Sequence, residues 1–123
     1  NSNEPTETPS ATRTTKAIGN KAEDVAAEFL KAQGYEIPHR NWKTKYCEID
    51  CIAENATTRY FVEVKYRSSA NQGGGIAAIT PKKLQQMHFA AELYMQKYPT
   101  TKQQLLLVAV VSKDESVELL EVI

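Results

Sequence analysis

Two short segments of the chain combine acidic, basic and apolar residues in a pattern that could act on a phosphodiester. The second segment, FVEVK at residues 61–65, reads as part of a strand, and its alternation places Glu63 and Lys65 on one face. Catalysis there would need a second carboxylate, held beside Glu63 by a neighbouring element. The first segment, EID at residues 48–50, ends in a residue that could supply it, Asp50.

The register of a predicted hairpin decides whether the two acids meet. If the loop of the hairpin is NATT at residues 55–58, Glu54 lies opposite Arg59. Opposed residue numbers have a constant sum along an antiparallel pair, so Asp50 then lies opposite Glu63. The same register gathers an apolar set on the other face of the hairpin: Cys47, Ile49, Cys51 and Ala53 with Tyr66, Val64, Val62 and Tyr60.

Two facing carboxylates need a charge that offsets their repulsion. Opposed Cβ atoms in a sheet lie about 5 Å apart, and like charges at that separation are destabilising. A divalent cation would offset the repulsion, because Mg²⁺ favours one or two carboxylates together with waters and phosphate oxygens. Lys65 could orient or help to deprotonate the attacking water. The alternative is an ordinary amphipathic hairpin whose charges face solvent.

Two predicted helices carry further candidates. Helical spacing of apolar residues predicts a helix over residues 14–33, and Glu23 borders its apolar stripe, where it could lean toward the hairpin or face solvent. A threonine N-cap followed by proline predicts a second helix beginning at Pro81. In that helix Lys83 borders the apolar face and Lys82 points away, so Lys83 is the better candidate for a phosphate contact.

The stretch HRNWKTKY, which precedes the acidic hairpin, mixes cations with aromatic residues. Cations bind phosphates and aromatic faces stack on bases, so this mixture predicts a nucleic-acid surface. A basic edge strand that resists aggregation is the alternative, and Pro38 favours such an edge position. The candidates for contact with nucleic acid are Arg40, Lys43, Lys45, Arg67 and Lys83.

Composition indicates one domain without a membrane segment. A chain of 123 residues has room for a single modest core, and its 15 basic and 15 acidic residues leave no global basic excess. The longest apolar run, residues 105–111, is shorter than the roughly 20 residues that a membrane-spanning helix needs. Residues 1–15 are polar and contain proline, so we expect a disordered tail before a single nuclease-like domain at 16–123.

The two cysteines indicate the cellular compartment. Cys47 and Cys51 lie four residues apart on one predicted strand, which separates their Cα atoms by roughly 13 Å. A disulfide needs less than about 7 Å. We therefore expect two reduced packing residues in a cytoplasmic protein.

The order of the predicted elements indicates the fold class. One helix and three strands are followed by a helix and two strands, an order of αβββαββ that fits an α/β fold with a central mixed β-sheet and flanking helices. The segment at residues 104–112 contains the continuous apolar run 105–111, as in a strand buried on both faces. Residues 68–79 form a glycine-rich loop without the GK[ST] ending of a phosphate-binding P-loop.

These same residues resemble a known family. The blocks GNKAEDVAAEFLKAQGY, RNWKTKYCEIDCIA, YFVEVKYR and GGGIAAITPKKLQQMHFAAELYM look like those of the YraN-like bacterial proteins. That family consists of predicted endonucleases similar to archaeal Holliday-junction resolvases, within the PD-(D/E)XK nuclease superfamily. The resemblance covers residues 16–98 and implies a restriction-endonuclease-like core that hydrolyses nucleic acid with Mg²⁺ or Mn²⁺.

The resemblance also implies roles for single residues. Those implied are Asp50 and Glu63 as metal ligands, Lys65 as the catalytic lysine, Glu23 as the helix glutamate and Lys83 as the lysine that opens the later helix. The chain departs from the family at two positions, where Cys47 and Ala22 replace the usual glycines. Neither departure removes a ligand, although Cys47 adds bulk beside the site.

The favoured hypothesis is therefore a Mg²⁺- or Mn²⁺-dependent endonuclease that acts on nucleic acid, with DNA as the expected substrate and a selectivity for structure. No small-molecule cofactor is expected. The alternative is a non-catalytic nucleic-acid-binding or scaffold protein that retains the nuclease fold, and a third hypothesis is a nuclease toxin module of a larger protein. Resolvase-like cutting of two strands would need a homodimer, for which the sequence carries no signal.

Overall fold

The computed structural model describes residues 11–68 and 79–122. The described elements are α1 (Ala11–Ala32), β1 (Glu36–Lys43), β2 (Glu48–Glu54), β3 (Thr58–Arg67), α2 (Pro81–Lys97), β4 (Gln103–Ser112) and β5 (Val117–Val122). This is the predicted order. Helix α1 begins earlier than expected, so residues 11–15, assigned to the tail, are helical. The rest of the tail and residues 69–78 of the glycine-rich loop lie outside the described residues.

The strands form one mixed sheet in the order β1-β2-β3-β4-β5. Strands β3 and β4 are parallel, and the other neighbouring pairs are antiparallel. Helix α2 connects the two parallel strands, which cannot be joined by a tight turn. As predicted, β1 is an edge strand and β4 lies inside the sheet, where residues 106–111 are all buried.

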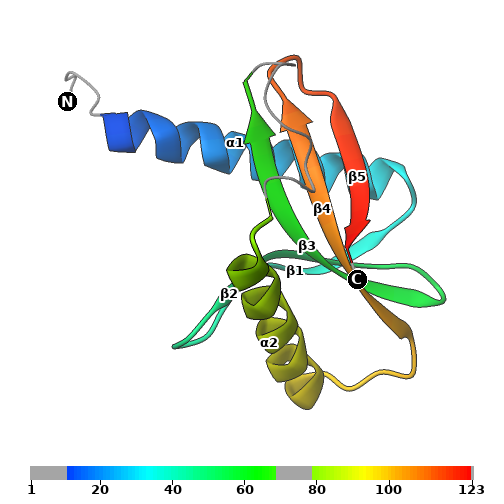
Figure 1. Ribbon diagram of the computed structural model, residues 1–123. Coiled ribbons are helices and arrows are strands. Elements are labelled where there is room, and N and C mark those ends of the chain that lie inside the picture. The colour runs from blue at the N-terminus through cyan, green and yellow to red at the C-terminus, as the bar shows by residue number, and fades with distance from the viewer. Residues whose placement is uncertain (1–10, 69–78, 123) are drawn as a thin grey trace, which may run out of the picture.

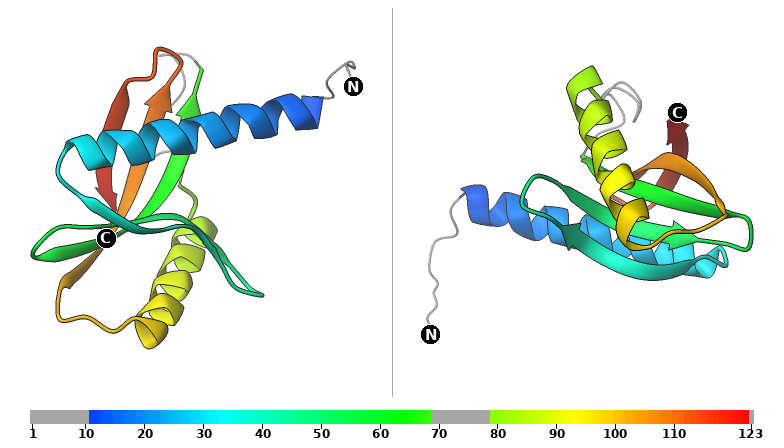
Figure 2. Two further views of the ribbon diagram at one scale, coloured as in Figure 1. Left: turned by 180° about the vertical axis from the view of Figure 1, so that it is seen from behind. Right: turned by 90° about the horizontal axis from the view of Figure 1, so that it is seen from below.

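One helix covers each face of the sheet (Figures 1 and 2). Helix α1 packs the small side chains of Ala22 and Ala26, together with Leu30, against the face that carries Val62 and Ala109. On the other face α2 packs a second core of larger residues: Met87, Ala90, Ala91 and Tyr94 against Ile49, Ile52, Phe61 and Leu106. The result is an α/β fold that matches a restriction-endonuclease-like core, and neither described helix is long and apolar enough to cross a membrane.

The β2–β3 hairpin has the predicted register near its turn. The pairs run from Glu54–Arg59 to Cys51–Val62. The expected pairing of Asp50 with Glu63 is not among them. Instead the Asp50 carboxylate Oδ2 accepts a hydrogen bond of 2.9 Å from the backbone N–H of Val64. The side chain of Asp50, rather than the backbone of β2, therefore bonds β3 at this point.

Strand β2 changes face beside Asp50, which the alternation did not predict. Ile49 and Cys51 are two residues apart, yet Ile49 packs in the α2 core and Cys51 in the α1 core. The prediction that the two residues share a face was wrong. Simple alternation fails here because the strand twists between Ile49 and Cys51, so that side chains two residues apart point to opposite faces of the sheet. Asp50 lies at this twist.

Strand β1 changes face at the matching position. Arg40 reaches Asp24 of α1, with 2.7 Å between its Nη2 and the aspartate Oδ1, whereas Trp42 packs against the α2 core. Between them Asn41 has a left-handed backbone with φ of 53°. Asparagine tolerates this conformation better than most residues. Because Trp42 pairs with Ile49, both strands turn over together.

Both cysteines are free, as their spacing predicted. Cys51 is buried, and burial raises the pKa of its thiol to about 11. The Cys47 Sγ is partly buried and lies 3.3 Å from the Thr44 hydroxyl. Their surroundings are those of packing residues.

Candidate active site

The two predicted acids lie close together at the point where β2 separates from β3. Glu63 is 8% exposed and Asp50 is half-buried. Burial raises the pKa of Asp50 from 3.8 to about 7, and the negative charge of Glu63 acts in the same direction. The hydrogen bond from Val64 opposes this shift without outweighing it. The site therefore holds two carboxylates whose joint ionisation is costly.

A lysine lies beside each oxygen of the Glu63 carboxylate. Lys65 of β3 has its Nζ 3.4 Å from Oε2, and Lys83 of α2 has its Nζ 3.4 Å from Oε1. The lysines come from different elements, so the fold brings them to one carboxylate. Both side chains remain about one third exposed, at 34% for Lys65 and 31% for Lys83. Their ammonium groups can therefore reach a ligand in solvent.

The N-cap of α2 positions Lys83. The side chain of Thr80 accepts a hydrogen bond of 3.1 Å from the backbone N–H of Lys83, which fixes the first turn of the helix. Lys82 is exposed and has no ion pair with a carboxylate in the described part of the chain. The helical projection that favoured Lys83 over Lys82 matches this arrangement.

Glu23 of α1 leans toward the hairpin. Its side chain is half-buried, and burial raises its pKa, although a hydrogen bond with the Asn41 side chain and the charge of Arg40 lower it. The charge of Glu23 in turn raises the pKa of Asp50. Glu23 therefore lies near enough to Asp50 for its charge to act on that carboxyl group.

The sequence analysis assigned no functional role to Asn41 or to Glu48. Asn41 bonds Glu23 through its side chain and turns β1 over through its backbone. Glu48 lies close enough for its charge to raise the pKa of Glu23. An asparagine inside an alternating strand was the available signal for Asn41, because this residue is enriched at left-handed positions. No comparable signal pointed to Glu48.

The donors at this site suit a hard cation with open positions. Carboxylate oxygens are the ligands that Mg²⁺ and Mn²⁺ prefer, and Asp50 and Glu63 supply two carboxylates on adjacent strands. Within residues 11–68 and 79–122, no three His, Cys, Asp or Glu side chains come together to hold an ion.

Three of the five predicted contacts for nucleic acid border one cavity. Lys43, Lys45 and Lys83 line a cavity of about 360 Å³ between α2 and the turn that joins β1 to β2. The other two lie elsewhere. Arg40 faces α1 through its ion pair with Asp24, and Arg67 lies beside β4, with its Nη2 3.3 Å from the Ser112 hydroxyl.

Comparison with known proteins gives one family. The model of the uncharacterised protein family UPF0102 matches residues 22–112, a segment that includes every residue of the candidate site. A UPF0102 protein of Caldicellulosiruptor saccharolyticus is 44% identical over 82 residues, which cover 67% of this chain and 70% of the relative. One of Herminiimonas arsenicoxydans is 37% identical over 81 residues, which cover 66% and 65%. The chain thus spans about two thirds of the length of these relatives.

Proposed function

This chain belongs to the uncharacterised protein family UPF0102, the YraN-like proteins, and we propose that it is a metal-dependent endonuclease that hydrolyses the phosphodiester bonds of DNA. The observation that carries the proposal is the meeting of Asp50 and Glu63, with a lysine at each oxygen of Glu63. Acids and lysines in this arrangement suit the transfer of a phosphoryl group to water.

Each group has a distinct role in this proposal. Asp50 and Glu63 would hold Mg²⁺ or Mn²⁺, which would supply an acidified water and positive charge to offset that of the phosphate. Lys65 orients the attacking water, and Lys83 donates hydrogen bonds to a phosphate oxygen. Both lysines are exposed enough to change partner from Glu63 to substrate. Glu23, the predicted helix glutamate, accepts hydrogen bonds from water beside Asp50.

The protonation of Asp50 should control binding of the cation. A carboxylate must be ionised to act as a ligand, and the pKa of Asp50 without a metal is raised to about 7. Affinity for Mn²⁺ should therefore increase as the pH rises through this value. Below this pH, binding of the cation should release a proton from Asp50.

One observation favours the alternative of a non-catalytic nucleic-acid-binding protein. Both oxygens of Glu63 already have a lysine within 3.4 Å, so this acid is neutralised without any cation. In that case the acids would serve the sheet, and the lysines of the cavity would bind nucleic acid in EDTA. The same assay separates the two functions.

The test is cleavage of end-labelled single-stranded, duplex and four-way-junction DNA, with an RNA control, in Mg²⁺, Mn²⁺ or EDTA. Asp50→Asn removes a metal ligand without adding a charge. Asp24→Asn, at an exposed aspartate of α1, is the matched control. We expect cleavage that needs a divalent cation, is lost in Asp50→Asn and persists in Asp24→Asn.

Two results would argue against the endonuclease. One is a wild-type protein that is inert with every metal and substrate yet binds DNA in EDTA, as the non-catalytic alternative requires. The other is cleavage at equal rates by wild type and Asp50→Asn, which would point to another site or to a contaminating nuclease. Titration of Mn²⁺ by calorimetry should give binding in wild type and none in Asp50→Asn.

A further inference from the structure

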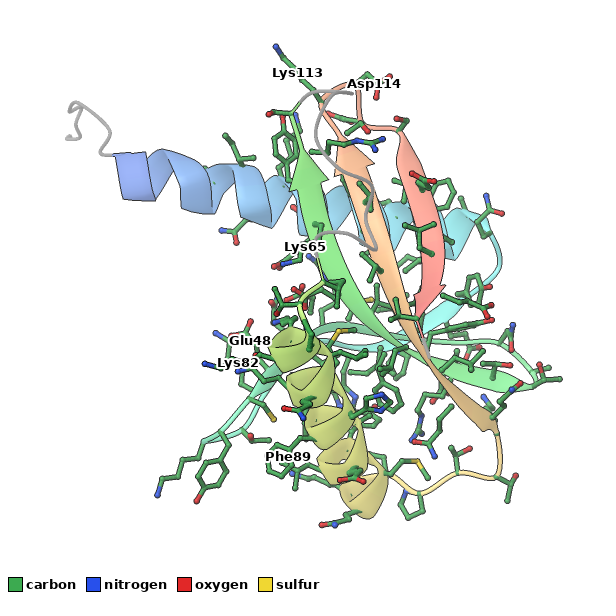
Figure 3. The ribbon with its side chains drawn as sticks, in the orientation of Figure 1. Glu48, Lys65, Lys82, Phe89, Lys113 and Asp114 are labelled. Atoms are coloured by element: carbon green, nitrogen blue, oxygen red, sulfur yellow. The ribbon has the colours of Figure 1, made fainter. Side chains whose placement is uncertain are left out.

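The cavity lined by lysines beside the candidate active site has so far been described only as a source of positive charge for nucleic acid. It lies between the β1–β2 turn and the first turns of α2, and Glu48 and Lys83 border both this cavity and the acidic site. In Figure 3 Glu48 lies beside the first turn of α2, far from Lys113 at the other end of the sheet. A molecule in this cavity would therefore lie next to the reacting phosphate. We call this cavity the lysine groove.

The lysine groove carries uncompensated positive charge. The described residues that line the groove include three lysines, Lys43, Lys45 and Lys83, and one carboxylate, that of Glu48. Neither Lys43 nor Lys45 has an ion pair with a carboxylate among the described residues, whereas Lys83 is shared with Glu63. The groove thus favours an anion that contacts Lys43 and Lys45.

An aromatic ring stands at the edge of the lysine groove. Tyr46 is 72% exposed, which is unusual for so large an apolar surface. The turn that carries it is held by Thr44, whose side-chain oxygen accepts hydrogen bonds of 3.1 Å from the backbone N–H groups of Tyr46 and Cys47. The Thr44 backbone N–H also donates to the Cys47 carbonyl at 2.8 Å. The backbone of this turn is therefore ordered, and the Lys45 Nζ lies 5.7 Å from the centre of the exposed Tyr46 ring.

An unpaired nucleotide fits these features better than a duplex does. An exposed ring offers a stacking face, which a base can use only when it has left its own stack. The volume of about 360 Å³ lies within the range of pockets that hold one small ligand. The lysines can then bind the phosphates on either side of that nucleotide.

We propose that the lysine groove binds an unpaired nucleotide next to the phosphodiester that is cleaved, with its base on Tyr46 and its phosphates on Lys43 and Lys45. This inference rests on the proposed function for its position beside the reacting bond. It makes the protein selective for DNA with a single-stranded segment, such as a flap, an overhang or an opened junction.

Binding in EDTA tests the groove without any cleavage. The probes are a short fluorescein-labelled single strand and the blunt duplex of the same sequence, measured by anisotropy with the full chain over a range of salt concentrations. The variants are Tyr46→Ala and the double variant Lys43→Gln/Lys45→Gln. Their controls are Phe89→Ala, at an exposed aromatic residue of α2, and Lys97→Gln/Lys113→Gln, at an exposed lysine that ends α2 and another that follows β4.

We expect Tyr46→Ala to weaken binding of the single strand at least about fivefold, as the loss of one stacked base would. The double lysine variant should also weaken it and should reduce the salt dependence by about 0.7 in slope for each phosphate that is no longer bound by a lysine. Binding of the duplex should change less in both variants. The controls should bind as wild type does.

Equal losses for strand and duplex, or no loss in either groove variant, would overturn the proposal for the groove. The cleavage assay keeps this failure separate from that of the endonuclease. Cleavage that needs Asp50 but is unchanged in the groove variants would contradict the proposal for the groove and leave that of the endonuclease intact. The opposite result is binding of the single-stranded DNA that needs Tyr46, in a protein that cleaves no substrate. It would contradict the endonuclease and leave the groove as a binding site.

Discussion

Asp50 lies where burial, a neighbouring negative charge and a hydrogen bond act on one carboxyl group. Burial and Glu63 raise its pKa to about 7, while the Val64 N–H and the charge of Lys83 act against the rise. A buried acid of this kind is costly to the fold once it is ionised. Groups with strongly shifted pKa values are concentrated at functional sites, which is why Asp50 is central to the proposed function.

Replacing Asp50 by asparagine should stabilise the protein at neutral pH in EDTA. The folded state holds a proton on Asp50 up to a pH of about 7, whereas the unfolded chain releases it near 3.8, so the free energy of unfolding falls as the pH rises between these values. Asp50→Asn removes that loss and can still accept the Val64 hydrogen bond. We expect a gain of roughly 2–4 kcal/mol at pH 8 and little change at pH 4, measured by urea unfolding.

The control for this experiment is Asp24→Asn, which should show no such gain. A variant Asp50→Asn that is less stable than wild type at pH 8 in EDTA would contradict the prediction. It would mean that the ionised carboxylate contributes more to the fold through its hydrogen bond than burial costs.

Lys83 and Lys82 are adjacent in sequence and allow a matched comparison. Lys83→Met removes a cation 3.4 Å from Glu63, whereas Lys82→Met removes an exposed one. We expect the rate of DNA cleavage to fall by roughly 10- to 100-fold in Lys83→Met and to stay near wild type in Lys82→Met.

A second measurement separates charge from folding in the Lys83 variant. The charge of Lys83 lowers the pKa of Asp50, so its removal should shift the pH at which Mn²⁺ binds to a higher value. Equal effects of the two lysine variants on both the rate and this pH would exclude a specific role for Lys83.

At the scale of the elements, the decisive feature is the point where β1 and β2 turn over. Asn41 has a φ of 53°, and its neighbours Arg40 and Trp42 face opposite sides of the sheet. On β2 the matching point is Asp50, between Ile49 and Cys51. A regular pair of strands would direct the aspartate to one face only. The turnover instead places it between β3 and both helices, near Glu63, Glu23 and Lys83.

The backbone of Asn41 predicts how substitutions there behave. A β-branched residue is disfavoured at positive φ, whereas glycine adopts it freely. Asn41→Val should therefore reduce the free energy of unfolding by about 1–3 kcal/mol, and Asn41→Gly should reduce it by less. Urea unfolding of the two variants measures the difference. Valine that is tolerated as well as glycine would show that the strand does not need a left-handed residue at this position.

At the scale of the whole molecule, a buried cationic cluster ties α2 to the sheet at the end away from the site. Arg59 of β3 is 6% exposed, and its Nε lies 2.6 Å from the Glu54 Oε2. Its Nη1 donates to the Tyr98 carbonyl at 2.5 Å, and its guanidinium lies 4.9 Å from the centre of the Tyr94 ring. These contacts fix the C-terminal end of α2 against the sheet. They therefore help to set the orientation of the helix and the position of Lys83 at its other end.

Aromatic residues complete this anchor. Tyr94 is buried, and its hydroxyl lies 2.6 Å from Nδ1 of His39 on the edge strand. Trp42 and Phe61 also meet its ring edge-on, with centroid distances of 5.1 Å and 5.7 Å. His39, which had no predicted role, thus links β1 to α2.

Removing Arg59 alone from its ion pair with Glu54 should reduce the free energy of unfolding more than removing both residues. Burial raises the pKa of Glu54, but hydrogen bonds from Arg59 and Lys102 outweigh it and lower the pKa, so the acid is ionised in the fold. Arg59→Met leaves that charge with Lys102 alone and should destabilise the protein by about 3–5 kcal/mol. The double variant Arg59→Met/Glu54→Met should be more stable than the single one in urea. A double variant as unstable as the single one, or less stable still, would contradict this reasoning.

The sequence by itself determined the order of the elements, the hairpin register next to its turn, the start of α2 at Pro81 and the proximity of Asp50 to Glu63. These features follow from local signals. Alternation, helical spacing, turn residues and an N-cap act between neighbours in the chain, so a pattern of residue types predicts them.

Only the tertiary structure decided which distant side chains meet. Arg40 and Lys43 come from one basic stretch, yet Arg40 bonds α1 and Lys43 lines the groove beside α2. Lys83 reaches Glu63 because a crossover helix packs on the face that carries this acid. The physical reason is that the turnover at Asn41 and the packing of α2 depend on contacts between elements far apart in the chain. No local periodicity encodes such contacts.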